Sequence, residues 1–330
     1  MIATMAEVAR LAGVSTATVS HVLNGTRPVR ETTREQVLAA MAQVHYTPNA
    51  AARSLATART RTVGLALSAI SNPYLGELLH AIEDESAAAG HTLLLADPHD
   101  DPGYEATAVA QLRSRVDGVL FAPSGGSTAT LEALAAQNVP TVLVDRMLDG
   151  RLDEVGSENV EPVAGLVTHL GGAGHDRIGF VMGLPGLSTT VERLEGYRLG
   201  MRRAGLPPGP VVEGRSDSEP ARVAVRELLA SPGRPAALVT GNNAMTIGAV
   251  QAAHDLGLSI PGDLALAAFD DFPWADAFSP RLTVVAQPFA EIGREAVRLL
   301  LRRMAEPDAE RRSLRLPTTF VHRESCGCRP

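Results

Sequence analysis

Apolar positions along most of the chain alternate between short continuous runs and stretches with helical spacing. After residue 61 come four apolar runs, V-G-L-A-L-S, T-L-L-L-A-D, D-G-V-L-F-A-P and V-P-T-V-L-V-D, separated by helical stretches near 73–89, 103–114 and 127–137. The order then repeats with R-I-G-F-V-M-G, V-V-E-G, A-A-L-V-T-G and L-A-L-A-A-F-D, separated by helical stretches near 189–204, 218–230 and 243–256. Strands that alternate with helices predict parallel sheets with helices on both faces. We therefore expect an α/β fold with two doubly wound halves.

The end of the chain is expected to cross between the two halves twice. Near Gln287 it should cross back to the first half for a long helix, Phe289–Met304, and the last strand, T-T-F-V-H-R, should return to the second half. The predicted first half is then 62–158 plus 288–316, and the second is 159–287 plus 317–330. Two such halves place a cleft at the carboxyl ends of their strands, where sheets of this kind bind ligands.

The first sixty residues have the pattern of short helices instead. Thr4 and Glu7 form a capping box before an amphipathic helix. Gly13 ends that helix, and Ser15 can cap a second helix that runs to about Leu23. Two short helices joined by a glycine turn predict a helix-turn-helix, whose second helix enters the DNA major groove.

The second helix of this pair has two distinct faces. Val14, Val19 and Val22 can pack on the first helix. Thr16, Ala17, Ser20 and His21 lie on the other face, where small side chains and a histidine can read base edges. The other candidate DNA-contacting residues of these two helices are Thr4, Ser15, Thr18 and Asn24. An ordinary two-helix corner with a solvated polar face is the alternative.

A third helix is expected from about Arg30 to Val44. Thr32 and Glu35 allow another capping box, and its apolar stripe is predicted to be Val37, Leu38, Met41 and Val44. Arg27, Arg30 and Arg34 are placed to meet DNA phosphates, which fix register but carry no sequence information.

The charge distribution supports a modular DNA-binding protein. All 30 basic residues are arginine. The first 61 residues hold seven arginines and three glutamates, a net charge of +4, whereas the rest holds 23 arginines against 34 acidic residues, a net charge of −11. A basic head on an acidic body is the electrostatic signature of such a protein.

Other compositional features exclude several classes of protein. No apolar run approaches the ~20 residues of a membrane span, and no secretory segment is present, so a cytoplasmic location without membrane attachment is expected. The two cysteines, Cys326 and Cys328, lie in what we expect to be a flexible tail without histidine partners. This spacing predicts neither a zinc site nor a disulfide framework. No metal or cofactor is expected.

Two stretches of the head carry a family resemblance: V-A-R-L-A-G-V-S-T-A-T-V-S-H-V-L-N-G and T-R-E-Q-V-L-A-A-M-A-Q-V-H-Y-T-P-N-A-A-A-R-S-L-A. They resemble the lac repressor (LacI) family of bacterial transcription regulators, and S-T-A-T-V-S-H-V-L-N-G-T-R is similar to its purine repressor branch. Almost the whole chain shares the resemblance. It implies a DNA-binding head (1–48), a hinge helix and linker (49–61), and an effector-binding and dimerisation domain (62–330) with a periplasmic-binding-protein fold.

The hinge is a second DNA-contacting segment that the resemblance implies. It would order only on cognate DNA, where two chains pair in the minor groove and Leu55 wedges into a base step. Arg53 would support it at the backbone, and Asn49 and Ala52 belong to the same contact. Ala56 replaces a lysine of the purine repressor branch, so one contact is missing. Ala17 replaces a threonine of that branch, so the branch's base preference at one operator position does not carry over to this chain.

Polar side chains cluster where the predicted strands of the body end, and they suit a sugar. Carboxylates accept hydrogen bonds from vicinal hydroxyls, arginine and asparagine donate to them, and an aromatic ring stacks on the apolar face of the sugar. The candidate ligand-contacting residues are Asn72, Tyr74, Ser124, Asp145, Arg146, Arg193, Asn242, Phe269, Asp270, Trp274 and Gln287. Asn243 stands where the family usually carries Asp. Leu187 replaces an Arg of the purine repressor branch, which argues against a purine effector.

Enzymatic motifs are weak in this chain. G-G-A-G-H-D-R-I-G, at residues 171–179, ends a helix and enters a strand, whereas a dinucleotide-binding loop does the reverse. We expect a non-enzymatic repressor that a sugar releases from a pseudo-palindromic operator. It should act as a homodimer or a dimer of dimers, although no C-terminal leucine heptad supports a coiled-coil tetramer. The alternatives are a corepressor-dependent regulator and a sugar-binding or enzymatic body with a vestigial head.

Overall fold

The computed structural model describes residues 3–24, 27–46, 59–68, 72, 75–148 and 150–328. The chain divides into two compact units, Met1–Thr60 and Arg61–Pro330. Each unit is described separately below.

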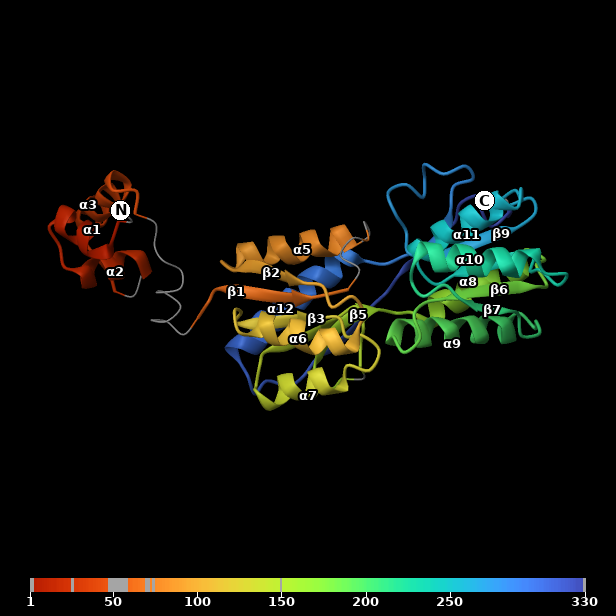
Figure 1. The fold of residues 1–330 in the computed structure, drawn as a ribbon, viewed down its shortest axis with the longest axis horizontal. Helices are drawn as coiled ribbons and strands as arrows, with labels where there is room; N and C mark the ends of the chain where they lie inside the picture. Colours follow the sequence, from red (N-terminus) through yellow and green to blue (C-terminus); the bar gives the residue numbers. More distant parts are fainter. Residues whose placement is uncertain are drawn as a thin grey trace. The chain divides into compact units, whose positions relative to one another are not determined.

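The first unit is a three-helix head with its own small core (Figure 1). It consists of α1 (Met5–Ala12), α2 (Thr16–Asn24) and α3 (Glu31–Gln43). The Thr4 hydroxyl accepts a hydrogen bond from the Glu7 amide at 3.3 Å, and Gly13 ends α1 with a φ of 66°. The left-handed conformation favours glycine at such a position. The core is formed by Val8, Ala9, Val19, Val37 and Ala40, so the predicted inward face of α2 is confirmed at Val19.

Two details predicted for α3 are wrong. The helix begins at Glu31 and no side chain caps it, so Thr32 lies inside the first turn and forms no capping box. Leu38 is 47% exposed, whereas Ala40 is buried. Positions 37, 40, 41 and 44 share one face at 3.6 residues per turn, and Leu38 lies one step around the helix from that face.

The first half of the second unit is built on a six-stranded parallel sheet. Its strand order is β11-β5-β4-β3-β1-β2. The strands are β1 (Thr62–Ala66), β2 (Thr92–Ala96), β3 (Gly118–Phe121), β4 (Thr141–Val144), β5 (Asp153–Ser157) and β11 (Ser313–Leu316). The helices are α5 (Leu75–Ala88), α6 (Pro102–Arg113), α7 (Thr128–Ala136) and α12 (Phe289–Ala305).

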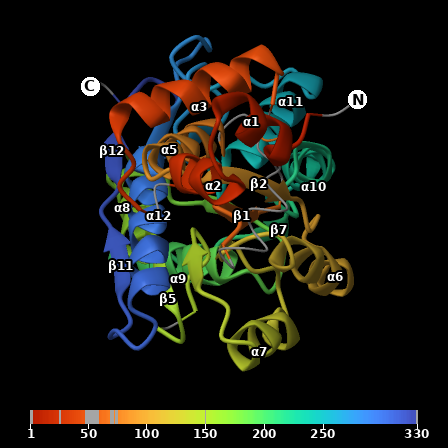
Figure 2. The ribbon, with the colours of Figure 1, turned by 90° about the vertical axis from the view of Figure 1, so that its left-hand side faces the viewer.

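Helices cover both faces of this sheet, as predicted. Val63 and Leu65 of β1 face the cluster that contains Leu78 of α5, whereas Ala66 faces the cluster that contains Leu112 of α6. Side chains alternate between faces along a strand, so a strand buried on both sides is apolar throughout. Figure 2 shows α5 and α12 on one side of the sheet and α6 and α7 on the other.

The second half repeats the plan with the strand order β12-β10-β9-β8-β6-β7. Only β12 is antiparallel, and it pairs with β10. The strands are β6 (Ile178–Met182), β7 (Val211–Glu213), β8 (Ala237–Thr240), β9 (Ala265–Phe269), β10 (Thr283–Ala286) and β12 (Thr319–Val321). The helices are α8 (Val160–Gly172), α9 (Ser188–Arg203), α10 (Ser218–Ala230) and α11 (Asn243–Asp255). The chain therefore crosses between halves after β5, β10 and β11, and the predicted α/β fold is confirmed.

The strand β5 is one that the apolar pattern did not reveal. Its sequence, D-E-V-G-S, is charged, yet all five residues are buried. Arg303 donates to Asp153 Oδ2 at 2.7 Å, and Glu154 accepts hydrogen bonds from the backbone amides of Leu148 and Gly150. Buried charges are tolerated when they are paired and hydrogen-bonded, and nothing local in the sequence identifies these partners.

The C-terminal segment after β12 is another departure from expectation. It is not a free tail, because Ser325 and Cys326 are fully buried. The prediction that the cysteines lack histidine partners is wrong, since His169 of α8 and His322 lie beside them.

In the described parts of the chain, none of the helices combines the length and apolarity that a membrane crossing needs.

Gly196 of α9 should be indispensable to the packing of α9 on α8. A Cβ at Gly196 would lie 2.4 Å from the Val160 carbonyl oxygen, whereas a Cβ at Gly165 of α8 would meet nothing within 4 Å. Gly196→Ala should therefore destabilise the protein by ~1–3 kcal/mol through overpacking. The matched change Gly165→Ala should stabilise it by ~0.5–1 kcal/mol through helix propensity. Urea denaturation of both variants checks this, and equal effects would contradict the packing described.

Candidate functional site

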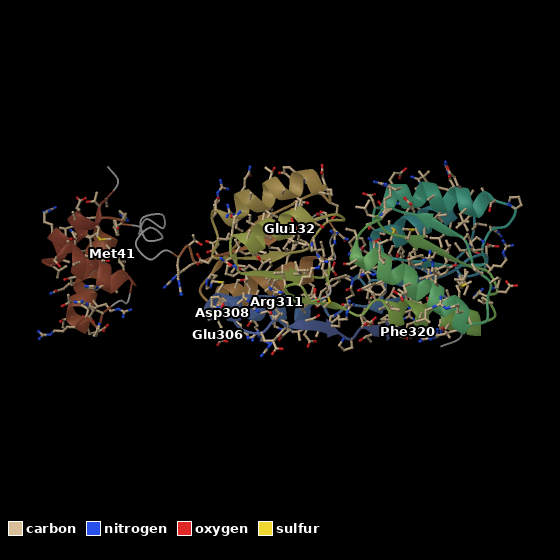
Figure 3. The ribbon with its side chains drawn as sticks, turned by 90° about the horizontal axis from the view of Figure 1, so that it is seen from below. Met41, Glu132, Glu306, Asp308, Arg311 and Phe320 are labelled. Carbon is tan, nitrogen blue, oxygen red and sulfur yellow. The ribbon has the colours of Figure 1, made fainter. Side chains whose placement is uncertain are left out.

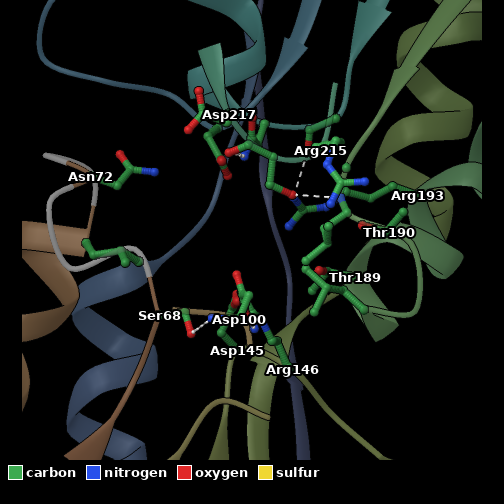
Figure 4. A pocket seen from close by; sticks show the side chains of 18 of the residues that line it. Ser68, Asn72, Asp100, Asp145, Arg146, Thr189, Thr190, Arg193, Arg215 and Asp217 are labelled. Carbon is green, nitrogen blue, oxygen red and sulfur yellow. Dashed lines mark hydrogen bonds and ion pairs between the residues drawn. The ribbon is translucent and has the colours of Figure 1, made fainter. Parts of the chain in front are cut away.

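A cavity of about 550 Å³ lies between the two halves, at the carboxyl ends of their strands. Figure 4 shows polar side chains from both halves pointing into it. Seven of the residues predicted from the sequence line it: Asn72, Asp145, Arg146, Arg193, Asn242, Asp270 and Gln287. The volume is in the usual range for small-molecule sites.

Two carboxylates occupy equivalent places in the two halves. Asp145 follows β4 and Asp270 follows β9, and both have positive φ angles, of 66° and 79°. Non-glycine residues in this region are uncommon and are often found at functional sites. Burial raises the pKa of both carboxyls, and the positive charge of Arg193 opposes that shift in each.

Arg193 is the cation that these carboxylates share. It projects from α9, is only 8% exposed, and donates to the Asn159 side-chain oxygen at 2.8 Å and to the Gly241 carbonyl at 2.7 Å. Its guanidinium carbon lies 3.9 Å from the centroid of the Phe269 ring. These contacts fix the guanidinium in one position, as a binding site that orients its ligand requires.

A second arginine comes from the first half. Arg146 pairs with Asp100 and donates to the Pro123 carbonyl at 3.2 Å. The two halves thus each contribute one buried arginine with fixed partners. Hydroxyl groups can accept hydrogen bonds from such arginines and donate to neighbouring carboxylates.

An amide pair joins the two halves, and one of its members, Asn72, lines the cavity. Asn72 Nδ2 donates to Asn243 Oδ1 at 3.1 Å, and Asn243 Nδ2 donates to Asn72 Oδ1 at 2.8 Å. Asn72 belongs to the first half, whereas Asn243 begins α11 in the second. Asn242 caps the same helix, since its side chain accepts from the Met245 amide at 2.8 Å. A change in the angle between the halves must lengthen or break the Asn72–Asn243 pair.

Three predicted ligand contacts do not lie in this cavity. The Phe269 ring is fully buried beneath Arg193, so it cannot stack on a ligand. Trp274 is 48% exposed and packs edge-on against Phe272 in the segment after β9. Ser124 lines a smaller neighbouring cavity. Tyr74, the remaining aromatic candidate, lies outside the described residues.

Other lining residues were missed by the sequence reasoning. They are Ser68, Asp97, His99, Asp100, Thr189, Thr190, Arg215, Asp217, Phe180 and Phe289. Asp97 follows β2 and Arg215 follows β7, so the strand-end rule that found Asp145 could have found them. Phe289 could not be found this way, because it enters the cavity from the start of α12. It offers the apolar surface that Phe269 and Trp274 do not.

The exposed face of α2 is the candidate DNA-binding surface. Thr16 and Ala17 are exposed, and Ser20 and His21 are partly exposed. The Ser15 hydroxyl accepts a hydrogen bond from the Thr18 amide at 3.1 Å, and this contact caps the helix. The Ser15 and Thr18 hydroxyls are also hydrogen-bonded to each other, so both side chains have a partner. Arg27, Arg30 and Arg34 are exposed around the start of α3. The Asn24 side chain and Asn49, Ala52, Arg53, Leu55 and Ala56 lie outside the described residues.

Comparison with known proteins agrees with this two-part organisation. Residues 4–49 match bacterial regulatory proteins of the lacI family, and residues 167–326 match a periplasmic binding protein-like domain. The ribose operon repressor of Escherichia coli K12 is 36% identical over 328 residues, covering 98% of this chain and 99% of that protein. The transcriptional repressor PurR of Photobacterium profundum is 33% identical over 328 residues, covering 98% of each. The lac repressor dimer bound to operator and the anti-inducer ONPF superposes with a TM-score of 0.89, 27% identity and 99% coverage of both chains.

Asp270→Asn should gain stability relative to the unmodified protein as the pH rises. Since burial raises the pKa of Asp270 in the folded state, its ionised form is favoured in the unfolded state, and this destabilises the fold above the raised pKa. The penalty disappears as the pH falls toward the ordinary aspartate pKa of about 3.9. The urea midpoint of the variant, relative to that of the unmodified protein, should be higher at pH 8 than at pH 5.

The matched control is Asp308→Asn, an exposed carboxylate on the segment after α12 (Figure 3). This exposed change should leave the urea midpoint within the small range usual for surface substitutions. A constant gap for Asp270→Asn between pH 8 and 5 would contradict the electrostatics described for the cavity.

Proposed function

The chain belongs to the lacI family of bacterial regulatory proteins, and we propose that it is a cytoplasmic repressor that a small sugar releases from its operator. It acts as a homodimer on a pseudo-palindromic site, since helix-turn-helix dimers bind paired half-sites. The observation that carries the proposal is the convergence of Asp145, Arg146, Arg193, Asp270 and Gln287 on one cavity in a chain that also has a helix-turn-helix head.

The proposed effector is a pentose of the ribose class. Carboxylates and arginines from both halves can bind vicinal hydroxyls, and Phe289 supplies an apolar surface. The similarity over the whole chain to a ribose operon repressor favours the same ligand class. A purine corepressor is the second candidate, because PurR is similar over the same length. Leu187, which lines the cavity, stands where the purine repressor branch has an arginine, and this favours the sugar.

The proposed DNA contacts divide into base readout and backbone contacts. Thr16, Ala17, Ser20 and His21 of α2 face the major groove and read bases, whereas Arg27 and Arg30 meet phosphates. In the hinge, Leu55 of each chain wedges into a minor-groove base step, with Asn49, Ala52, Arg53 and Ala56 beside it.

The proposed mechanism couples the cavity to the operator through the angle between the two halves. Three chain segments join the halves, and the Asn72–Asn243 pair bridges them on the cavity side. A sugar that contacts Arg146 in one half and Arg193 in the other favours a different angle, which separates the paired hinges and weakens operator binding. By linkage, operator DNA must weaken sugar binding by the same factor.

Arg193→Ala should uncouple the two activities. The variant lacks the guanidinium that Arg193 contributes to the cavity. It should therefore bind operator with unchanged affinity but require far more ribose for release. The control Arg198→Ala removes an exposed arginine from the same helix and should respond to sugar normally. Fluorescence anisotropy with labelled operator and a ribose titration measures both properties. Full inducibility of Arg193→Ala would refute the assignment of this cavity.

Thr16→Ala should reduce operator affinity without affecting non-specific DNA binding. Loss of a base contact costs ~1–3 kcal/mol, or roughly 5- to 150-fold in affinity. The control Gln36→Ala removes an exposed polar side chain from α3 and should leave operator affinity unchanged. Competition between operator and random duplex at fixed salt makes the measurement. Equal losses for both duplexes would show that Thr16 contacts the backbone instead.

A further inference from the structure

Two cysteines and two histidines meet at the edge of the second half, away from the ligand cavity. His169 lies in the last turn of α8, and His322, Cys326 and Cys328 follow β12 at the end of the chain. One nitrogen or sulfur from each of the four residues lies within 4.8 Å of all the others. Cys326 is fully buried and the other three are partly buried.

The spacing of these atoms fits a tetrahedral metal ion. His322 Nε2 lies 3.2 Å from Cys326 Sγ, and Cys328 Sγ lies 3.4 Å from His169 Nε2. Zn–S bonds of about 2.3 Å and Zn–N bonds of about 2.0–2.1 Å in tetrahedral geometry place neighbouring ligand atoms roughly 3.3–3.8 Å apart. Two thiolates and two imidazoles are a usual ligand set for structural zinc.

The loop that carries the cysteines is anchored by protein contacts. The Ser325 hydroxyl donates to the Leu266 carbonyl at 2.7 Å and accepts from the Thr283 amide at 2.8 Å. Gly327 has a φ of 75°, so the chain turns between Cys326 and Cys328 and both sulfurs face His169. A preformed site of this kind loses little conformational entropy when a metal binds.

The surroundings of the histidines also suit a metal. The ring of Phe320 is stacked on His322 and tilted against His169, at centroid distances of 6.1 and 5.1 Å. Figure 3 shows Phe320 at the surface of this half.

We propose that His169, His322, Cys326 and Cys328 bind one structural Zn²⁺ ion. Four protein ligands leave no open coordination position, so the ion is not catalytic. It cross-links the C-terminal segment to α8, the helix whose N-terminal end carries Asn159, the partner of Arg193 in the ligand cavity. The metal thereby holds α8 in the position from which Asn159 orients Arg193.

The test is the zinc content and thermal stability of the full-length, untagged chain in reducing buffer. The protein is stripped with a chelator and titrated with Zn²⁺ alone, and the bound metal is measured by mass spectrometry. We expect about one Zn²⁺ per chain, as one four-ligand site requires, together with a higher thermal midpoint. Co²⁺ in place of Zn²⁺ should give the visible absorption of a tetrahedral thiolate site.

Cys328→Ser and His169→Asn should each lower zinc affinity more than the roughly 10- to 100-fold that loss of an outer-shell partner causes. His80→Asn is the control, because His80 is an exposed histidine on α5. A cooperative thermal unfolding transition of each variant shows that the second unit has folded. The proposal is overturned if the unmodified chain binds no stoichiometric zinc, or if both ligand variants bind it as tightly as the control does.

Discussion

The effector domain depends on one buried guanidinium, that of Arg193, whose charge acts on two buried carboxylates. Arg193 is fixed by Asn159 and Gly241, and its charge opposes the effect of burial on the pKa of Asp145 and Asp270. Taking charges out of water is costly unless they are paired and hydrogen-bonded. The cavity therefore concentrates polar groups that can exchange hydrogen bonds with a polyhydroxyl ligand.

The same groups tie ligand binding to the angle between the halves. Asp145 follows β4 in the first half, whereas Arg193 of α9 and Asp270 after β9 belong to the second half, so their mutual geometry changes when the halves rotate. A ligand that prefers one angle can shift the equilibrium only by its difference in affinity for the two arrangements. The hydrogen bonds between Asn72 and Asn243 join the two halves at the angle seen here, and they must change when one half rotates against the other.

The sequence was sufficient to predict those features of the fold and of the site that depend on local pattern. The strand–helix alternation predicted the two parallel sheets, and the strand-end rule placed seven residues around one cavity. Prediction from the sequence failed where contacts between residues far apart in the chain determine the structure. The charged strand β5 is stabilised by Arg303, which is 150 residues away, and Phe269 is covered by a guanidinium from another element.

The C-terminal cysteines show the same limit most clearly. The C-x-C pattern alone predicts a flexible tail, because His169 is 159 residues from Cys328 and no spacing rule links them. The fold brings them together by returning the last strand to the second sheet, beside α8. His322, four residues before Cys326, is the one histidine of this cluster that lies near the cysteines in the sequence.

The central claim, that the cavity and the operator-binding head share one equilibrium, is tested by a thermodynamic cycle on the unmodified protein. D-ribose binding is measured by calorimetry with and without saturating operator, and operator affinity is measured with and without saturating ribose. The account predicts that each ligand weakens the other by the same factor, typically 5- to 150-fold for coupled sites. Ribose binding that is unchanged by operator, or tight binding of hypoxanthine or guanine with none of ribose, would contradict it.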